Sequence, residues 1–350
     1  MPRRAHDFDS DTLQIPDSLL AVEPVSTRET FPDGPSLSSY AVGVAIEPLF
    51  ATDIFRIGRW KCVVGPEEST AVQSQRWPMM SFTHVGAFIV HSGGRSSVID
   101  PSCALLINPG VPYRMSRHIG ERSRGAYVLV RPDVFGDVAR AGAVAPRGFS
   151  EIEGPSSTET YLLQHALLDR IAAEPAPDAL EIDEMGMALL DAALSPVAPE
   201  DDGITARRRR QHATIQRVRA LVLERLAEPM KLDAVALAAG LSPFHLCRVF
   251  RRITGRTLHR YRTILRLREA VDRLSEGRTD IAQLSLDLGF SSHSHFTAAF
   301  RKEFGMSPSR MRKGRLRELR RSWMQEPARD FSAMPALDAV GRGPWREPPA

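Results

Sequence analysis

The pattern of hydrophobic and polar positions changes along this chain. Between residues 40 and 135, short apolar runs recur, separated by turn residues such as Ser92-Gly93-Gly94 and Asn108-Pro109-Gly110. Many short strands at regular spacing are typical of a small all-β sandwich or barrel. The strands are expected at Tyr40–Ile46, Ile54–Ile57, Cys62–Val64, Gly86–Val90, Ser97–Ile99, Ala104–Ile107 and Ala126–Val130.

From about residue 158 the apolar positions take up helical spacing. A first helix is predicted around Tyr161 to Ile171 and a second over Leu180–Leu194. Helical patterns resume after a linker rich in Pro, Asp and Gly. We therefore expect a disordered arm over 1–37, a β-domain over 38–140, a helical dimerisation or linker region over 141–206, a helical domain over 207–322 and a disordered tail over 323–350.

The composition is that of an ordinary globular protein, with 43% hydrophobic and 25% charged residues. No run approaches the roughly 18 apolar residues of a membrane helix. The charged start of the chain lacks the apolar run of a secretory signal. The three cysteines are too few and too scattered for a disulfide framework or a zinc finger. We expect a cytoplasmic protein without membrane contact.

Charge is distributed unevenly along the chain. Residues 207–321 hold 27 basic and 10 acidic side chains, a net charge of +17, whereas the whole chain carries +4. The remainder therefore carries −13. A basic block fused to an acidic one favours a polyanionic partner for the basic block.

The basic block contains an internal repeat, residues 232–255 and 281–305. Gly240 and Gly289 match at an offset of 49, whereas positions after them match at 50, so the second copy has one extra residue in its turn. Glycine suits the left-handed conformation that ends helices. Each copy therefore predicts a helix, a tight turn and a second helix.

The second helix of each copy has its own signals. Ser242, and Ser291 or Ser292, are N-cap candidates, and Pro243 suits a first helical position. Apolar residues at helical spacing predict a buried stripe on each helix, which leaves the opposite face exposed. The stripes are Leu246, Val249, Phe250 and Ile253 in copy one and Phe296, Ala299, Phe300 and Phe304 in copy two.

A helix-turn-helix inserts its second helix into the DNA major groove, with the N-terminal residues leading. Arg248 has the geometry to bind guanine O6 and N7, and Phe244 to contact a thymine methyl group. A helix pair used only for packing is the alternative. The DNA-binding candidates are Phe244, His245, Cys247, Arg248, Arg251 and Arg252 in copy one, and Ser292, His293, Ser294, Thr297, Ala298 and Arg301 in copy two.

Copy two with the following Gly305-Met-Ser-Pro-Ser-Arg-Met-Arg312 resembles the signature of AraC/XylS-type transcription regulators. Copy one with the following Gly255-Arg-Thr-Leu-His-Arg-Tyr261 is similar to the first motif of that family. The resemblance covers about residues 212–315. It implies a seven-helix DNA-binding domain in which a long helix, about Leu258–Ser275, holds two reading helices in successive major grooves.

Carried over from the family, the base-contacting positions are those of the candidates Phe244, Cys247, Arg248, His293, Ser294, Thr297 and Ala298. Cys247 and Ala298 stand where longer polar side chains are common in the family. The reading face of copy two therefore lacks an arginine, and its readout is expected either to be weaker or to rest on His293. The long helix is expected to bury one apolar stripe and to be covered by arginines elsewhere.

The family resemblance implies an upstream cupin-like barrel that binds an effector or dimerises, and Asp100–Tyr113 resembles the second cupin motif. A metal-binding cupin needs histidine at Tyr113 and a closely spaced histidine pair, and this chain has neither between residues 40 and 135, so no metal and no cofactor are expected. Tyr113, Arg114 and Arg117 are candidates for binding an anionic effector, or they lie on a solvated strand end. The helices at 158–195 either form a dimer interface or cover the barrel.

The fold class expected is multidomain α+β, a cupin-like β-barrel with appended helices followed by an all-α domain with two helix-turn-helix motifs. The expected function is a sequence-specific transcription regulator, an activator, without enzymatic activity. Its expected partners are double-stranded promoter DNA, a small-molecule effector, a second copy of the chain and RNA polymerase. Two alternatives are a cupin-type metal-dependent enzyme with a DNA-binding appendage and a non-specific architectural DNA binder.

Overall fold

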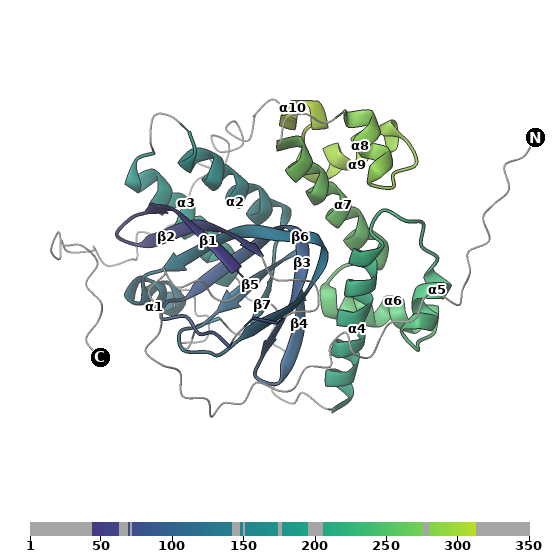
Figure 1. Ribbon diagram of the computed structural model, residues 1–350, viewed down its shortest axis with the longest axis horizontal. Helices are drawn as coiled ribbons and strands as arrows, with labels where there is room; N and C mark the ends of the chain where they lie inside the picture. Colours follow the sequence, from purple (N-terminus) through teal and green to yellow (C-terminus); the bar gives the residue numbers. More distant parts are fainter. Residues whose placement is uncertain are drawn as a thin grey trace, which may run out of the picture.

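The computed structural model describes residues 44–62, 69–70, 72–141, 148–149, 151–173, 177–194, 206–275 and 280–312. The arm predicted over 1–37 and the tail predicted over 323–350 lie outside these residues. In Figure 1 the β-sheet, in blue, has α2 and α3 along one side and the green helices α4–α10 along another.

The first half of the chain folds into a seven-stranded antiparallel sheet of order β1-β2-β6-β3-β5-β7, with β4 also paired to β3. Register shifts between Thr83 and Ala87 mark irregularities in the β3–β6 pairing, of the kind that bend a sheet. The strands are β1 (Val44–Ala51), β2 (Phe55–Cys62), β3 (Met79–Ser92), β4 (Arg95–Ile99), β5 (Cys103–Ile107), β6 (Arg114–Val130) and β7 (Glu153–Pro155).

Several strands are longer than the apolar runs predicted, and β7 lies outside those runs. Gly86–Val90 and Ala126–Val130 are parts of the long strands β3 and β6, because polar residues such as Thr83 and Ser123 are also buried in these strands. Cys62 ends β2, and the other two residues of the run predicted at Cys62–Val64 lie outside the described residues. Apolar runs alone therefore understate a strand whose buried face includes hydroxyl side chains.

Each face of the sheet buries its own set of apolar residues. Trp60, Phe88 and Leu105 belong to the cluster inside the curved sheet. Phe55 and Phe82 lie on the other face, under α1 (Pro132–Ala141), α2 (Thr158–Ile171) and α3 (Ala179–Leu194). A Cβ atom at Gly186 of α3 would lie 2.6 Å from the Phe55 ring, so this helix approaches the sheet closely. The helices α2 and α3 thus cover the sheet, and α1 was not expected from the sequence.

Seven helices follow in the described part of the chain, as the family resemblance implied. They enclose two separate cores, and the long helix α7 contributes Tyr261 and Leu265 to one core and Leu267 and Val271 to the other. The helices are α4 (Ala206–Glu224), α5 (Leu232–Ala238), α6 (Pro243–Thr254), α7 (Leu258–Ser275), α8 (Ile281–Asp287), α9 (His293–Phe304) and α10 (Pro308–Arg312). The α7 bounds match the predicted helix.

The two halves of the molecule share apolar contacts. Tyr161 and Leu162 of α2 belong to the core built mainly by α7, α8 and α9. Ala220 of α4 packs with residues of β3, β4 and β6, among them Ile89 and Val98. The helices α4–α10 are therefore docked on the first half of the chain through contacts with α2 and, by way of α4, with the sheet.

Within the described residues, no single helix is long and apolar enough to cross a membrane. Among these helices, only α5 and α6 taken together have the length and composition of a membrane span, and they are bent by 80° at the break between them.

Candidate DNA-reading surface, effector cavity and domain interface

The two copies of the repeat have the same capping frame. The Ser242 hydroxyl accepts a hydrogen bond from the backbone N–H of His245 in α6, and the Ser292 hydroxyl accepts one from His295 in α9. Pro243 occupies the first turn of α6. Each helix ends at a glycine, Gly255 or Gly305, with φ 70° and ψ −1°, a left-handed conformation that favours glycine. Of the two N-cap candidates in copy two, Ser292 is the cap.

The turn of copy two admits only glycine. Gly289 has a φ of +73°, and a Cβ atom there would lie 2.1 Å from the carbonyl oxygen of Ala227. Gly240 in copy one has a similar φ of +65° but open space around it. The two turns therefore share a backbone conformation, but only copy two packs its turn against a neighbouring loop.

The predicted stripes face the two cores, and all their residues are buried except Ile253 and Ala299, which are partly buried. Leu246, Val249 and Phe250 of α6 lie in one core. The corresponding aromatic residues of α9, Phe296 and Phe300, lie in the other. Because burial fixes this face of each helix, the opposite face points away from the core and is free to meet a partner.

Most candidates of copy one are exposed. The Phe244 side chain is 77% exposed, an unusual value for an aromatic residue, and His245 is half-buried. Arg252 donates a hydrogen bond of 2.5 Å to the side chain of Gln211 in α4, so its guanidinium is held beside the start of that helix. The exposed candidates are Phe244, Cys247, Arg248, Arg251 and Arg252.

The candidates of copy two are also mostly exposed, with two qualifications. The hydroxyl oxygen of Thr297 is buried, so this side chain is less accessible than its neighbours. Ser292 is exposed, but its hydroxyl is engaged as the N-cap. The exposed candidates are Ser292, His293, Ser294, Ala298 and Arg301.

A partly open cavity lies inside the curved sheet, and its empty volume of about 560 Å³ includes space open to solvent. Tyr113, one of the three effector candidates, lines it. Arg114 is not among the lining residues, and the Arg117 side chain is outside the described part. The described lining residues carry no charge: Val44, Ile46, Trp60, Gln73, Gln75, Met79, Ser81, Phe88, Leu105, Tyr113, Met115, Tyr127 and Leu129.

The cavity corrects the expectation of an anionic site built by Tyr113 with Arg114. Side chains alternate between the faces of a strand. Tyr113 and Met115 point into the cavity, so Arg114 between them belongs to the other face. Tyr113 is 2% exposed, which also excludes a solvated strand end for this residue.

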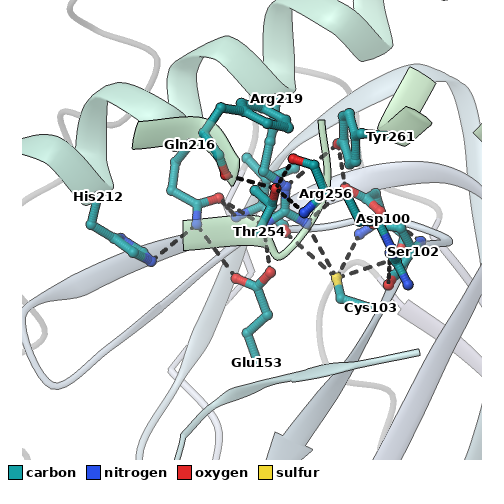
Figure 2. A network of polar contacts seen from close by, with 12 residues as sticks. Asp100, Ser102, Cys103, Glu153, His212, Gln216, Arg219, Thr254, Arg256 and Tyr261 are labelled. Atoms are coloured by element: carbon teal, nitrogen blue, oxygen red, sulfur yellow. Dashed lines mark hydrogen bonds and ion pairs between the residues drawn. The ribbon is translucent and has the colours of Figure 1, made fainter. Parts of the chain in front are cut away.

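The interface between the two halves contains a buried ion pair that sequence analysis missed (Figure 2). Asp100, in the turn between β4 and β5, is fully buried, and its Oδ2 accepts hydrogen bonds from Arg219 Nη2 at 2.7 Å and from the Tyr261 hydroxyl at 2.6 Å. The backbone N–H of Ser102 donates to Oδ1 at 2.6 Å. Burial alone raises the pKa of this carboxyl, but the Arg219 charge and these hydrogen bonds hold the pKa below its ordinary value. Asp100 is therefore a buried carboxylate.

Arg219 of α4 has a second acidic partner. Its Nη1 lies 2.5 Å from Glu153 of β7, and its Nη2 lies 3.4 Å from the sulfur of Cys103 on β5. Beside it, the Gln216 Oε1 accepts the backbone N–H of Val98 at 2.9 Å, which closes the gap between α4 and β4. One helix of the DNA-binding half thus contacts strands β4, β5 and β7.

Arg268 of α7 is fully buried, whereas arginines on this helix were expected at the surface. Its guanidinium donates to the carbonyl oxygens of Pro101 and Ser156 and lies over the Tyr161 ring, 4.4 Å from the centroid. The spacing along α7 indicated that this position is buried, because residue 268 follows Ile264 by four and lies on the apolar stripe. The expectation that an arginine side chain is exposed outweighed that spacing.

Two buried histidines lie where α2 meets β3. The rings of His84 and His165 stack with centroids 4.4 Å apart, and His84 Nε2 lies 3.2 Å from Gln164 Oε1. Burial, and then the charges of Arg59 and Arg124, lower the pKa of His84 to about 4. Within the described residues no group of three or more His, Cys, Asp or Glu side chains is placed to hold a metal ion.

Comparison with known proteins assigns both halves. Residues 235–314 match the family described as a helix-turn-helix domain, and residues 80–190 match the AraC-like ligand binding domain. The chain is 39% identical over 85 residues to "Probable transcription factor PqrA" of Proteus vulgaris, which is 24% of this chain and 70% of that protein. It is 36% identical over 86 residues to "Regulatory protein SoxS" of Salmonella typhimurium, which is 25% of this chain and 80% of that protein.

A longer match joins the chain to "HTH-type transcriptional regulator GlxA" of Rhizobium meliloti, with 33% identity over 123 residues, 35% of this chain and 38% of that protein. Among solved structures, the DNA-binding domain of AdpA in complex with a target DNA has 25% identity and a TM-score of 0.29, covering 30% of this chain and 95% of that chain. ToxT from Vibrio cholerae with bound unsaturated fatty acid has 13% identity and a TM-score of 0.29, covering 75% of this chain and 95% of that chain.

These matches leave no room for the interpretation of the chain as a metal-dependent enzyme with a DNA-binding appendage, because they account for the β-domain as well as the helices. The chain belongs to the AraC family of transcription regulators, with an AraC-like ligand-binding domain followed by a helix-turn-helix DNA-binding domain.

Proposed function

We propose that α6 and α9 read two successive major grooves of one promoter site. The observation that carries this proposal is the shared frame of the two copies, each with a serine N-cap, a left-handed glycine C-cap and an exposed polar face. The helix α7 joins the two cores and so fixes the separation of the two reading helices. Paired reading helices on one rigid scaffold are suited to two half-sites about one helical turn apart.

The reading roles differ between the copies. In α6, Arg248 is assigned to a guanine edge, Phe244 to a thymine methyl group, and Arg251 and Arg252 to phosphates, since cations further along the helix position it on the backbone. His245 and Cys247 complete this face. In α9, His293, Ser294, Thr297 and Ala298 face the bases, Ser292 holds the helix start, and Arg301 faces a phosphate.

The direction of regulation and the assembly are further parts of the proposal. We infer activation, with RNA polymerase as the second macromolecular partner, on the behaviour that the family resemblance implies. We also infer a homodimer through the helical region. The start of α3 supports this, because Leu180 is 64% exposed there. Sedimentation velocity of the full chain tests the dimer, and Leu180→Glu is expected to shift it to monomer.

Selection of bound DNA from a random pool, with the full-length protein at a stated salt concentration, tests the reading function. We expect two short conserved blocks centred about one helical turn apart. Arg248→Ala is expected to erase the preference at one position of one block. The matched control is Arg95→Ala, which removes the same charge from the β3–β4 hairpin, far along the chain from both reading helices.

A pool that yields no consensus while binding stays strongly dependent on salt overturns the proposal. That outcome favours a non-specific architectural DNA binder, whose affinity comes from phosphate contacts and counterion release. A reporter gene with the selected site upstream of its promoter then tests the direction of regulation. A fall in expression contradicts activation.

A further inference from the structure

We propose that the cavity of the β-domain binds an uncharged, largely apolar small molecule that presents a hydrogen-bond acceptor to the side-chain amide of Gln73. The proposal rests on this domain being the sensor of the regulator and adds the chemical class that the sensor selects. It depends on the cavity walls, on one chain of hydrogen bonds, and on the position of strand β5.

The walls of the cavity favour an apolar occupant. Most of its described lining residues are aliphatic or aromatic, and none is charged. A charged group buried in such a space without a partner loses its hydration and gains no counter-charge. A carboxylate or an ammonium group on the ligand is therefore disfavoured, whereas a ring system or an alkyl chain is accommodated.

The polar groups at the cavity form a directed chain. Gln75 Nε2 donates to the Tyr113 hydroxyl at 2.9 Å, and this hydroxyl donates to Gln73 Oε1 at 3.4 Å. In this arrangement the oxygen of the Gln73 amide is the atom that faces Tyr113. The other end of that amide, Nε2, is buried and has no hydrogen-bond partner in the described part of the chain.

The backbone holds Gln73 in this position. Gln73 N donates to the carbonyl oxygen of Tyr113 at 2.7 Å, and Tyr113 N donates back to the carbonyl oxygen of Gln73 at 2.8 Å. Gly110 N donates to the carbonyl oxygen of Gln75 at 2.8 Å. A buried donor that is held in place and unpaired is costly, so a ligand carbonyl or ether oxygen at this point gains the bond that the protein lacks.

The cavity keeps this neutral character over the physiological pH range. Burial raises the pKa of the Tyr113 hydroxyl to about 12, against a smaller opposing effect of the hydrogen bond from Gln75. The hydroxyl therefore stays protonated and remains a donor to Gln73. We expect ligand affinity to be independent of pH between about 7 and 9, because this range lies between the ordinary histidine and tyrosine pKa values.

Strand β5 connects the cavity to the domain interface. Leu105 lines the cavity, and Cys103, two positions earlier on the same strand, belongs to the same apolar cluster. The Cys103 sulfur lies 3.4 Å from Arg219 Nη2, within the interface network around Asp100. A ligand that displaces β5 therefore acts on the contact that holds α4, and we expect it to change DNA affinity.

Calorimetric titration of the full-length protein with three matched probes tests the class of ligand. The probes are 2-acetylnaphthalene, which carries a carbonyl acceptor, 2-ethylnaphthalene, which keeps the ring and the two-carbon chain but lacks the carbonyl oxygen, and 2-naphthoate, which is anionic. We expect the ketone to bind about tenfold more tightly than the hydrocarbon. We expect the carboxylate to bind more weakly than either.

Two variants locate the acceptor contact. Gln73→Leu is expected to remove the tenfold preference for the ketone while binding of 2-ethylnaphthalene persists, which also shows that the cavity is intact. Ser81→Ala, which removes another polar group from the cavity wall, is expected to leave the preference unchanged. Tyr113→Phe, which frees the Gln73 amide to rotate, is expected to reduce the preference without abolishing binding.

Several results overturn the proposal. These are tighter binding of 2-naphthoate than of the ketone, equal binding of ketone and hydrocarbon, no binding of the ketone, or loss of the preference in Ser81→Ala instead of Gln73→Leu. DNA selection in the absence of any probe is an independent measurement. A protein that selects a consensus site but fails these titrations retains its proposed reading function and loses only the assigned ligand class.

Discussion

The two reading helices share a backbone frame and differ in charge. Their caps agree in residue type and dihedral angles at the C-terminal glycine, and their buried stripes occupy equivalent positions. At an offset of 50, however, Arg248 of α6 corresponds to Ala298 of α9, and Phe244 corresponds to Ser294. The residues that pack the core and the residues proposed to read DNA therefore lie on opposite faces of the same helix, so either set can vary while the other is kept.

The copies also differ in how the β-domain holds them. Copy one is joined to the sheet through α4, where the Arg219–Asp100 pair has side chains 3% and 0% exposed. Copy two is held to α2 by the hydrogen bond that Thr158 donates to Glu303. Within the helical half, Glu303 also pairs with Arg260 of α7, and the two side chains are 1% and 43% exposed. The first half of the chain therefore contacts copy one through a buried ion pair and copy two through a hydrogen bond to a buried glutamate.

The largest expected difference between the copies follows from the ion pairs of Arg219 and Arg260. Arg219→Met leaves Asp100 buried without its guanidinium, and we expect the free energy of unfolding to fall by about 3–5 kcal/mol. Arg260→Met is expected to cost about 1 kcal/mol, because this arginine is 43% exposed and the buried Glu303 keeps its bond from Thr158. Denaturant unfolding measures both.

Arg95→Met serves as the control, because it breaks an ion pair whose side chains are 45% and 43% exposed. Its expected cost is below about 0.5 kcal/mol. An equal loss of unfolding free energy in Arg219→Met and Arg260→Met contradicts the expected difference between these two ion pairs.

Acidification is expected to loosen copy two before copy one. Burial lowers the pKa of His84 to about 4, below its ordinary value of 6.5. Its contribution is complete above pH 6.5 and is lost as the pH falls toward 4, because the unfolded chain binds the proton first. At pH 5 the free energy of unfolding is therefore expected to be about 2 kcal/mol lower than above pH 6.5 because of His84.

Hydrogen exchange locates this effect. His165 stacks on His84 from α2, and Tyr161 of the same helix lies in the core of copy two. Protection factors in α2 and α9 are therefore expected to fall more between pH 7 and pH 5 than those in α6. His84→Gln should flatten this dependence, and an equal loss in all three helices contradicts it.

Exchanging the arginine between the copies sharpens the comparison on DNA. Arg248→Ala is expected to weaken binding to a selected site about 10- to 100-fold, since one bidentate guanine contact is worth about 1–3 kcal/mol. Ala298→Arg places a guanidinium at the equivalent position of α9 and is expected to create a new guanine preference in the second half-site. Selection from a random pool measures both preferences.

The salt dependence of DNA binding gives a second readout. Removing one phosphate-neutralising side chain reduces the steepness of log affinity against log salt by about 0.9. Arg251→Ala is expected to make this slope shallower and to leave the consensus unchanged, in contrast to Arg248→Ala. A changed consensus in Arg251→Ala would mean that Arg251, which we assign to a phosphate, contacts a base.

The smallest expected effect is at Cys247, which corresponds to Thr297 in copy two. Cys247→Thr is expected to change DNA affinity less than about threefold, because it replaces one short side chain by another on a face that already contains Arg248. Alkylation of the exposed thiol of the wild type is expected to block binding, and Cys247→Thr should resist that block. If the alkylated wild type still binds DNA, Cys247 does not lie on the surface that contacts DNA.

The frame of the DNA-binding half was predictable because its signals are local. Ser242, Pro243 and Gly255 act within one or two turns of α6, and the buried stripe follows from helical periodicity. The face that reads DNA is the complement of that stripe. None of this requires knowledge of the distant parts of the chain.

The domain interface and the cavity were not predictable in the same way. Asp100 and Arg219 are 119 residues apart, and their contact depends on how two domains dock. Arg268 stood on an apolar stripe, and Arg114 stood on the strand face opposite to Tyr113, so periodicity alone was informative at both positions. The charge of an arginine suggested solvent in one case and a ligand in the other.

The Asp100 network limits how this regulator can be recombined with its relatives. Asp100, Pro101 and Ser156 belong to the sensor half, whereas Arg219 and Arg268 belong to the DNA-binding half. In a chimera that joins this sensor to a foreign DNA-binding domain, Asp100 is buried against the residue that replaces Arg219. Unless that residue is also a cation, the carboxylate has no partner. The unit that can be exchanged is therefore a sensor together with the few side chains on the other domain that neutralise it, and a graft is compatible when it carries those side chains with it.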